Sequence, residues 1–447
     1  MLTVKAAKAI GGRIVLPPSP DLLLLSSVTA LGAGRPMRIA PVVSCPLTEG
    51  LRELLAPALD IAPEGDQWRV TPRQDDDAGS ITLPAASFRF RDFIVFLLLG
   101  LKKDIVFAQT PAKAIARWQS LARSAGCEIV SKDRNGGAAL SLMSSEAFAI
   151  PAAADADALH ALLGLAMGLR RRISHQIDFH FPSPLRILLP ALGYAFTLKS
   201  AGEGAENEAL AKRMRFLRAR KKSDQGVSYL LNADFSAGSN DEAAITLPGD
   251  DILGSILLAA KGLVQRGNLV VENMPLEPWA TPVLSLLRKM GCRPAVQETG
   301  ATSGGRVGMI QLQRFDLLGR KTDCTPLYQY AAHIPSMVVL ACFAQGQSVL
   351  RGLGALRDDE PDGIERILTC VRALGGRHGE MPDGIVIDGA KQLDGFDLDD
   401  DLPPSLGGAF AVAGLKCLGA TSIADTGLSQ RWPGFAAMLD EIGEYRK

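Results

Sequence analysis

One stretch of sequence decides the fold: Leu247-Pro-Gly-Asp-Asp-Ile-Leu-Gly-Ser-Ile-Leu-Leu-Ala-Ala260. A Pro-Gly turn leads into small and apolar residues at helical spacing, which predict a helix over Ile252–Leu263. A β-rich segment follows at Leu269–Val271, and a second helix is expected over Pro282–Met290, where Gly291 ends it. The stretch therefore opens a helix–strand–helix unit of mixed α and β structure.

Outward from this stretch, the same pattern recurs down the chain in six copies, at spacings of about 65–95 residues. The first helices of the six copies are expected at Leu22–Leu31, Phe93–Leu101, Ala158–Leu169, Ile252–Leu263, Ile334–Phe343 and Ala409–Leu418. One copy cannot bury both of its faces, so we expect three copies to assemble into one domain, twice over. Between the expected elements, Gly300–Gly308 is interpreted as a Gly-rich loop.

The charge balance gives no reason to expect nucleic acid or an anionic membrane as a partner. The 447 residues include 48 Lys and Arg and 48 Asp and Glu, so the formal net charge is zero. The longest apolar run, around Phe93–Leu101, is about half the length of a membrane-spanning helix. We therefore expect no membrane association, and we regard nucleic acid as an improbable partner.

The seven cysteines are widely spaced, odd in number and without a CxxC pair. That pattern is typical of reduced, buried thiols in a cytosolic protein, and it argues against a disulfide framework or a zinc site. The first residues, Met1–Gly12, carry no signal-peptide pattern, and the chain contains no nucleotide-binding fingerprint. We predict cytoplasmic localisation, and we expect neither a metal nor a cofactor.

A basic segment interrupts the repeats. Residues Ser200–Gln225 separate the third and fourth copies, and seven Lys and Arg side chains lie between Lys212 and Lys222. Such a cluster could hold an acidic partner or a phosphate. The alternative, which we favour, is an insertion with a solvated helical face over Glu206–Arg220.

Several motifs carry a family resemblance. In chain order they are Leu16–Ser19, Leu247–Ala260, Ile334–Ala344, Gly352–Arg357, Glu360–Asp362, Ala409–Leu415 and Trp432–Phe435. In this order and at these spacings they resemble the EPSP synthase family of enolpyruvyl transferases, over almost the whole chain. The resemblance implies an α/β (α+β) fold of two inverted α/β barrel-like domains, each built from three repeated helix–strand–helix–strand units, with the active site in the cleft between them.

The resemblance also implies domain boundaries and site residues. One domain would span residues 19–243, with the basic insertion at 200–225, and the other would span residues 1–18 plus 244–447. Glu360 falls at the position of the catalytic glutamate. Arg91, Asp250, Arg357 and Asp362 fall at substrate-binding positions of the family, and Lys113 lies near another such position. His333, directly before the helix start at Ile334-Pro335, is a candidate general base. The alternative is a purely structural role, a hydrogen bond at the helix start.

Other positions depart from the family pattern. The family's lysine near the N-terminus falls at Pro20, its catalytic aspartate at Ala332, and a lysine near the C-terminus at Gln430. A position that is arginine in the family is Gly363 here. The last three residues of the family's Gly-Asp-His-Arg motif are replaced by Pro403, Pro404 and Ser405. Each lost charged contact typically costs about 1.5–3 kcal/mol, so the resemblance implies the fold and not the usual reaction.

Three function classes follow. The preferred hypothesis is a diverged EPSP synthase-like protein that uses the interdomain cleft for a small anionic metabolite, without standard enolpyruvyl transfer to shikimate 3-phosphate. The alternatives are a genuine 3-phosphoshikimate 1-carboxyvinyltransferase, and a non-catalytic binding or assembly protein built on this fold. Whether the chain is an enzyme stays open; if it is one, the resemblance implies a transferase of the carboxyvinyl transferase superfamily.

Overall fold

The structure is a computed structural model of the whole chain. It describes residues 1–73, 80–84, 88–134, 137–179, 181, 183–200, 228–236, 241–314, 316–325, 331–359, 362–399 and 402–445. The predicted catalytic residue Glu360 and the basic cluster from Lys212 to Lys222 lie outside these residues.

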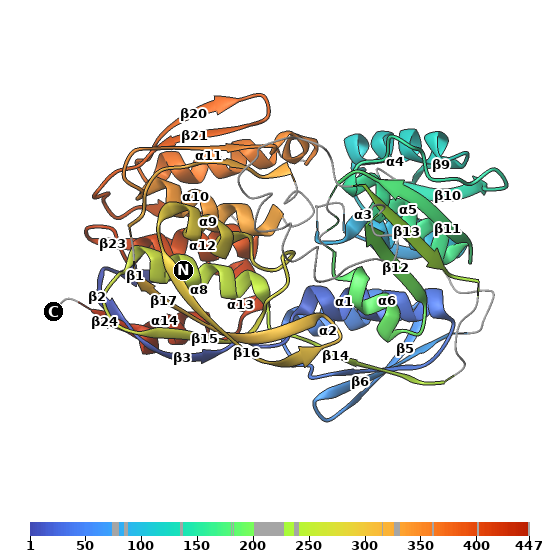
Figure 1. Cartoon of the computed structure of the whole chain (residues 1–447), viewed down its shortest axis with the longest axis horizontal. Helices are drawn as coiled ribbons and strands as arrows, with labels where there is room; N and C mark the ends of the chain where they lie inside the picture. The colour runs from blue at the N-terminus through green and yellow to red at the C-terminus, as the bar shows by residue number, and fades with distance from the viewer. Residues whose placement is uncertain are drawn as a thin grey trace, which may run out of the picture.

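The chain forms two lobes that lie side by side, and both termini belong to the second lobe, at the left of Figure 1. Among the described residues, the first lobe has three sheets. Their strands, in spatial order, are β14 (Ala243–Thr246), β4 (Met37–Ala40), β6 (Gln67–Pro72) and β5 (Leu59–Glu64); β7 (Ile81–Leu83), β8 (Ile105–Phe107), β10 (Gly137–Ser144) and β9 (Glu128–Arg134); and β11 (Arg172–Ile177), β13 (Tyr229–Asp234) and β12 (Ala195–Ser200).

The second lobe repeats this plan in the described part of the chain, with a small additional sheet. Its strands are β16 (Arg293–Thr302), β17 (Gly305–Arg314), β15 (Leu269–Pro275) and β3 (Gly12–Val15); β18 (Lys321–Asp323), β19 (Gln347–Arg351), β21 (Gly384–Asp388) and β20 (Arg377–Met381); β1 (Leu2–Lys5), β23 (Ala420–Ile423) and β22 (Asp397–Leu398); and the pair β2 (Ala7–Ile10) and β24 (Gly443–Tyr445).

Helices fill the space between the sheets. The first lobe contains α1 (Pro20–Ala33), α2 (Pro46–Leu55), α3 (Arg91–Gly100), α4 (Ala112–Ser124), α5 (Ala156–Gly168) and α6 (Leu185–Ala191). The second contains α8 (Asp251–Leu263), α9 (Pro282–Met290), α10 (Ile334–Cys342), the 3₁₀-helix η2 (Gly354–Asp358), α11 (Gly363–Ala373), α12 (Pro404–Gly414), α13 (Thr426–Arg431) and α14 (Phe435–Ile442). This repeated mixed architecture confirms the predicted fold class.

The central helix of each repeat is buried on nearly all sides. In α3, every residue from Phe93 to Gly100 is buried, and every residue of α8 and α10 is buried. A helix that is apolar all round belongs in the interior of a protein, which explains the small and apolar composition of these segments. None of the described helices is both long enough and apolar enough to cross a membrane.

Two separate hydrophobic cores divide the chain. One is built from buried residues between Leu22 and Leu247, together with Trp279 and Ala280. The other contains buried residues from Leu2 to Leu16 and from Ile252 to Ile442. The chain therefore passes twice between the lobes, at residues 17–21 and 248–251. The sequence predicts domain boundaries after residues 18 and 243. These exact boundaries remain a prediction.

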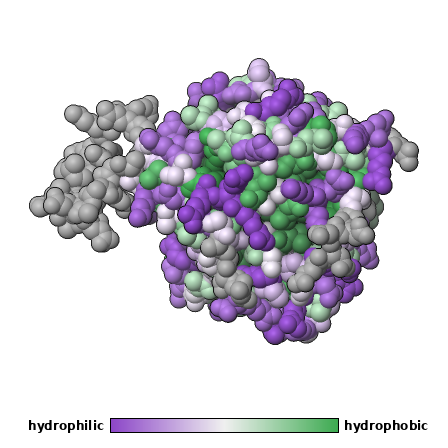
Figure 2. Space-filling model, turned by 90° about the vertical axis from the view of Figure 1, so that its right-hand side faces the viewer, coloured by the Kyte–Doolittle hydropathy of each residue, from purple (hydrophilic) through white to green (hydrophobic). Residues whose placement is uncertain are grey.

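The outer end of the first lobe faces the viewer in Figure 2. Hydrophobic residues are visible near the middle of this face, and hydrophilic residues surround them. Apolar side chains of this lobe therefore reach the surface at the end away from the second lobe.

Two expectations from the sequence need correction. Residues 300–308, expected to form a loop, belong mostly to the long hairpin of β16 and β17, whose strands pair from Arg293 with Arg314 to Thr302 with Gly305. The last central helix, α12, begins at Pro404, ahead of the expected Ala409. Most of β16 is exposed to solvent, so the hairpin has little of the apolar alternation that identifies a strand.

Candidate functional site

The two passages of the chain between the lobes lie against each other. The backbone N–H of Ser19 donates to the carbonyl of Pro248 at 3.0 Å, and that of Asp250 donates to the carbonyl of Pro17 at 2.7 Å. Ser19 and Asp250 are also the N-caps of α1 and α8. The first turns of these two helices, one from each lobe, therefore meet at the junction.

Arg431, the last residue of α13, joins both helix starts. Its Nη1 and Nη2 donate to the two carboxylate oxygens of Asp21 at 3.1 and 2.8 Å. Its Nε and Nη2 donate to Oδ2 of Asp250 at 3.1 and 3.0 Å, and Trp432 Nε1 donates to the same oxygen at 2.8 Å. The Asp250 side chain is fully buried, and 9% of the Arg431 side chain is exposed. One guanidinium thus serves two carboxylates, one from each lobe.

Arg89 makes the second bridge between the lobes. Its Nη1 and Nη2 donate to the two oxygens of Asp251, both at 2.8 Å. Only 3% of the Arg89 side chain is exposed, and that of Asp251 is fully buried. Such a two-pronged pairing of guanidinium and carboxylate is the strong form of an ion pair. It fastens the segment before α3 in the first lobe to the start of α8 in the second.

The backbone at Phe90 aims two neighbouring arginines at different places. Phe90 has a φ of 63° and lies in the left-handed region, which costs a bulky residue about 1–3 kcal/mol. Arg89, on one side, reaches across to the other lobe. Arg91, on the other side, stays inside the first lobe, with its guanidinium 5.4 Å from the ring centre of Trp118. This strained turn separates the two arginine side chains.

His333 completes the buried group. Its Nε2 lies 3.0 Å from Oδ2 of Asp251, and its Nδ1 lies 2.8 Å from Oγ of Ser255. The order Asp, His, Ser resembles a Ser-His-Asp catalytic triad. However, His333 and Asp251 are completely buried and Ser255 is 1% exposed, so this arrangement has no open face toward a substrate. We call Asp21, Arg89, Asp250, Asp251, His333 and Arg431 together the ionic cluster.

Burial and neighbouring charges together set the pKa values of the ionic cluster. Burial would raise the pKa of Asp251, but Arg89 and His333 outweigh it and hold this pKa well below its usual range. Burial raises the pKa of Asp250 in spite of Arg431, and burial lowers the pKa of His333. At neutral pH a neutral imidazole and two guanidiniums therefore face three carboxyl groups, so the cations are already engaged.

A second contact between the lobes lies at Lys113 and Arg357. Lys113, near the start of α4, donates from Nζ to the backbone carbonyl of Arg357 in η2 at 3.0 Å. The Arg357 guanidinium donates to Oδ2 of Asp362 at 3.0 Å and to Oε1 of Glu380 at 2.6 Å. Asp362 also caps α11, accepting from the N–H of Ile364 at 2.8 Å. A lysine side chain of one lobe therefore contacts the backbone of η2 in the other lobe.

The site residues predicted from the sequence divide among three places. Asp250 and His333 belong to the ionic cluster. Lys113, Arg357 and Asp362 lie at the second contact, and Arg91 is buried in the first lobe. Their functional roles stay predictions.

Sequence reasoning missed Asp21, Arg89, Asp251 and Arg431. Each is a neighbour of a position that the motifs had singled out: Pro20, Asp250, Gln430 or the Arg91 segment. Local charge next to a motif was therefore the available signal.

Comparison with known proteins points to one family. A family model described as EPSP synthase (3-phosphoshikimate 1-carboxyvinyltransferase) matches residues 236–439. A 3-phosphoshikimate 1-carboxyvinyltransferase of Acaryochloris marina is 29% identical over 200 residues, which are 44% of this chain and 45% of that protein. One of a Synechococcus species is 30% identical over 179 residues, 40% of this chain and 41% of that protein. The chain thus matches about half the length of these curated relatives.

Solved structures are similar along the whole chain. An EPSP synthase of Acinetobacter baumannii superposes with a TM-score of 0.68 at 16% identity, covering 100% of this chain and 99% of that one. The enolpyruvyl transferase NikO of Streptomyces tendae gives 0.65 at 15% identity, covering 99% and 97%. These likenesses show the fold, and the family model identifies the sequence of the second half. Residues 236–439 therefore match the EPSP synthase family in sequence, and the whole chain shares the fold of its solved members.

Proposed function

We propose that this chain is a diverged member of the family that binds a small anionic metabolite between its lobes and does not carry out standard enolpyruvyl transfer to shikimate 3-phosphate. One observation carries the proposal. The chain's own carboxylates, Asp21 and Asp251, occupy the two arginines that bridge the lobes at the junction.

A phosphate dianion would be poorly received in the ionic cluster. To reach Arg431 it would have to displace Asp21 or Asp250, and to reach Arg89 it would have to displace Asp251. Each displacement leaves a carboxylate facing the incoming anion, and such contacts between like charges cost several kcal/mol. The family's reaction needs cations for phosphate and carboxylate groups, so this arrangement disfavours it.

Acid–base chemistry also lacks a group at the expected place. The family resemblance places the catalytic aspartate at Ala332, whose methyl group cannot transfer a proton. The next residue, His333, has both ring nitrogens within hydrogen-bond distance of Ser255 and Asp251. Since a general base needs reach to the proton that it removes, His333 does not replace the missing aspartate in this arrangement.

The second contact between the lobes suits a small anion better. Lys113 and Arg357 approach it from opposite lobes, and both are partly accessible: the side chain of Arg357 is 28% exposed. Asp362 and Glu380 both pair with Arg357 and neutralise it, so the Lys113 ammonium, which donates to a carbonyl and carries three N–H donors, is the positive charge offered to an anion. A single positive charge matches a singly charged anion better than a phosphate dianion. The acidic partner considered for the segment from Lys212 to Lys222 stays a separate prediction.

Phosphate release tests the reaction directly. The full chain is incubated with phosphoenolpyruvate and shikimate 3-phosphate, and inorganic phosphate is measured. We expect release no faster than without protein. Turnover at an ordinary enzyme rate, about 1–10³ per second, would contradict the proposal and favour the alternative of a genuine 3-phosphoshikimate 1-carboxyvinyltransferase, which the family match on residues 236–439 supports.

Thermal unfolding tests the binding of a small anion. Pyruvate is used as the monoanion and inorganic phosphate as its more highly charged counterpart. We expect pyruvate to raise the unfolding temperature of the wild-type chain, with the rise abolished in Lys113→Met and kept in Lys5→Met, a lysine on β1 of the second lobe. No shift with either anion would overturn anion binding and favour the non-catalytic assembly alternative.

A further inference from the structure

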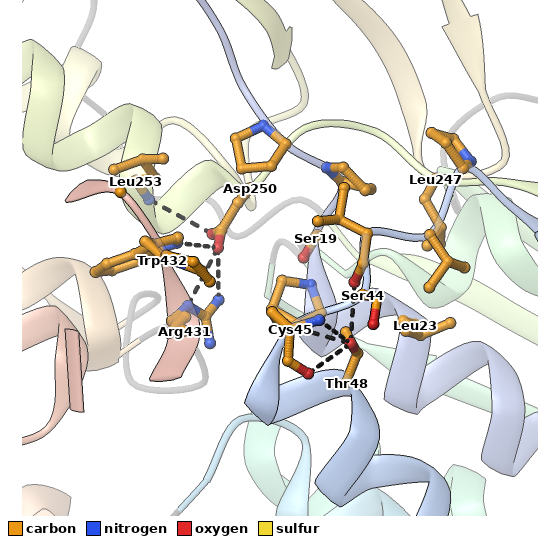
Figure 3. A pocket seen from close by; sticks show the side chains of 18 of the residues that line it. Ser19, Leu23, Ser44, Cys45, Thr48, Leu247, Asp250, Leu253, Arg431 and Trp432 are labelled. Atoms are coloured by element: carbon orange, nitrogen blue, oxygen red, sulfur yellow. Dashed lines mark hydrogen bonds and ion pairs between the residues drawn. The ribbon is translucent and has the colours of Figure 1, made fainter. Parts of the chain in front are cut away.

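A cavity of about 210 Å³ lies beside the two passages of the chain between the lobes. Figure 3 shows it from close by. Its walls include Pro17 and Asp250 from the two passages, Val43 and Cys45 from the first lobe, and Trp432 and Phe435 from the second. We call this cavity the hinge pocket. A molecule in it would touch both lobes and both passages at once.

The polar groups of the hinge pocket are already engaged. The Asp250 carboxylate accepts from Arg431, from Trp432 and from the start of α8. The Thr48 hydroxyl accepts from the N–H of Cys45 at 2.9 Å, and Ser44 Oγ donates to Glu49 at 3.0 Å. Figure 3 shows Arg431 and Trp432 turned toward the Asp250 carboxylate, and Cys45 beside Thr48. A ligand would gain little by presenting a charge to groups that are satisfied in this way.

Electrostatics exclude an anion from the hinge pocket. Its guanidinium, Arg431, is shared by the carboxylates of Asp21 and Asp250, so no net positive charge faces the space. A buried charge without a partner is costly. The pocket therefore favours a neutral molecule, which distinguishes it from the contact at Lys113 and Arg357.

Apolar side chains at the pocket provide the attraction. Val15 and Val43 both line it and are 65% and 47% exposed, unusually high for large apolar side chains. Covering apolar area is worth about 25 cal/mol per Å². The rings of Trp432 and Phe435 lie 5.8 Å apart at 33° in the wall, and aromatic walls favour offset or edge contacts with another ring.

The size of the cavity limits the ligand. Its volume of about 210 Å³ lies below the range of about 300–1,000 Å³ that holds drug-sized ligands. We propose that the hinge pocket binds a small neutral aromatic molecule of one ring. The ligand contacts both lobes, so its affinity depends on how they are placed relative to each other. This site does not depend on the anion bound at Lys113 and Arg357.

Fluorine NMR of fluorobenzene, titrated with the full chain, tests the proposal. We expect its signal to broaden with wild-type protein, and 4-fluorobenzoate to bind at least about tenfold more weakly, equivalent to about 1.4 kcal/mol. Val43→Trp, which places an indole at the rim, should weaken fluorobenzene binding by a similar factor. The matched control is Val296→Trp on β16, where the valine is 40% exposed and does not line the hinge pocket.

Three outcomes would overturn the site: no broadening with the wild type, equal binding by fluorobenzoate, or equal binding by both tryptophan variants. A second measurement needs no pocket variant. Cys45 lines the pocket, so bound fluorobenzene should slow its alkylation by N-ethylmaleimide, followed by mass spectrometry of the peptide that contains it. An alkylation rate that saturating fluorobenzene leaves unchanged would also reject the proposal.

Discussion

Arg431 and Asp21 lie 410 residues apart in the chain, and two hydrogen bonds of 3.1 and 2.8 Å join their side chains. Asp21 is in the first turn of α1, and Arg431 ends α13 in the other lobe. The pair therefore connects the first helix of one lobe with the last part of the other. The same guanidinium also binds Asp250. Arg431 is therefore the cation that Asp21 and Asp250 share.

Removing this guanidinium should destabilise the folded chain strongly. In Arg431→Met, Asp250 would lose its cation and Asp21 would keep only the longer contact with Arg89, at 3.5 Å; breaking a buried pair in this way typically costs about 3–5 kcal/mol. Urea unfolding measures the change. The control is Arg13→Met, which removes an ion pair with Glu272 from a side chain that is 66% exposed, where the cost should stay below about 1 kcal/mol. Equal costs for the two variants would contradict the role of Arg431.

The two-pronged pair of Arg89 and Asp251 should show direct energetic coupling. A double-mutant cycle with Arg89→Met and Asp251→Asn is expected to give an interaction free energy of about 0.5–3 kcal/mol, as for residues in one charged network. The same cycle on Arg306 and Glu277, where Arg306 is 54% exposed, should give a clearly smaller value. Additive single effects at Arg89 and Asp251 would show that the observed contact adds no stability.

Proline at the start of a helix and glycine just past its end made helix bounds predictable from sequence. The expected bounds of α9 agree with the structure. For α9, Pro282 fits a first helical position and Gly291 adopts a φ of 107° just past the end, and both features depend on local sequence alone. The exposed hairpin of β16 and β17 lacks such a local signal, so its strands were missed.

The ionic cluster could not be predicted in the same way. Its pairs join residues that are far apart in sequence, such as Arg89 with Asp251 and Arg431 with Asp21, and they form only because the two passages between the lobes lie side by side. The motifs located the correct segments, as Asp250 and His333 demonstrate. Which neighbouring charges meet there depends on the backbone turn at Phe90 and on the position of α13, and neither is encoded by spacing.

Close packing of α3 against α5 makes a glycine substitution costly. A Cβ atom on Gly164 would lie 2.3 Å from the backbone oxygen of Phe93, and a backbone atom cannot move aside as a flexible side chain can. We expect Gly164→Ala to lower the free energy of unfolding by about 1–3 kcal/mol. In Gly50→Ala on exposed α2, nothing lies within 4 Å of the added carbon, and helix propensity should raise stability by up to about 1 kcal/mol. Effects of the same sign in both variants would contradict this packing.

The pH dependence of stability should report on His333. Burial lowers its pKa below the ordinary 6.5, so the unfolded chain takes up a proton that the folded chain resists. The stability from the neutral imidazole is therefore complete above about pH 6.5 and is lost as pH falls toward the lowered pKa.

Unfolding measured from pH 7.5 to 5 should show stability falling with pH in the wild type, and less steeply in His333→Gln, whose amide can still donate to Asp251. Arg89 stays charged, Asp251 keeps a lowered pKa, and Asp250 titrates in both proteins. Burial also lowers the pKa of His175, so His175→Gln is measured for comparison; because His175 is only partly buried, its replacement should reduce the slope less than His333→Gln does. If His333→Gln keeps the full wild-type slope, His333 is not the group whose burial sets this dependence.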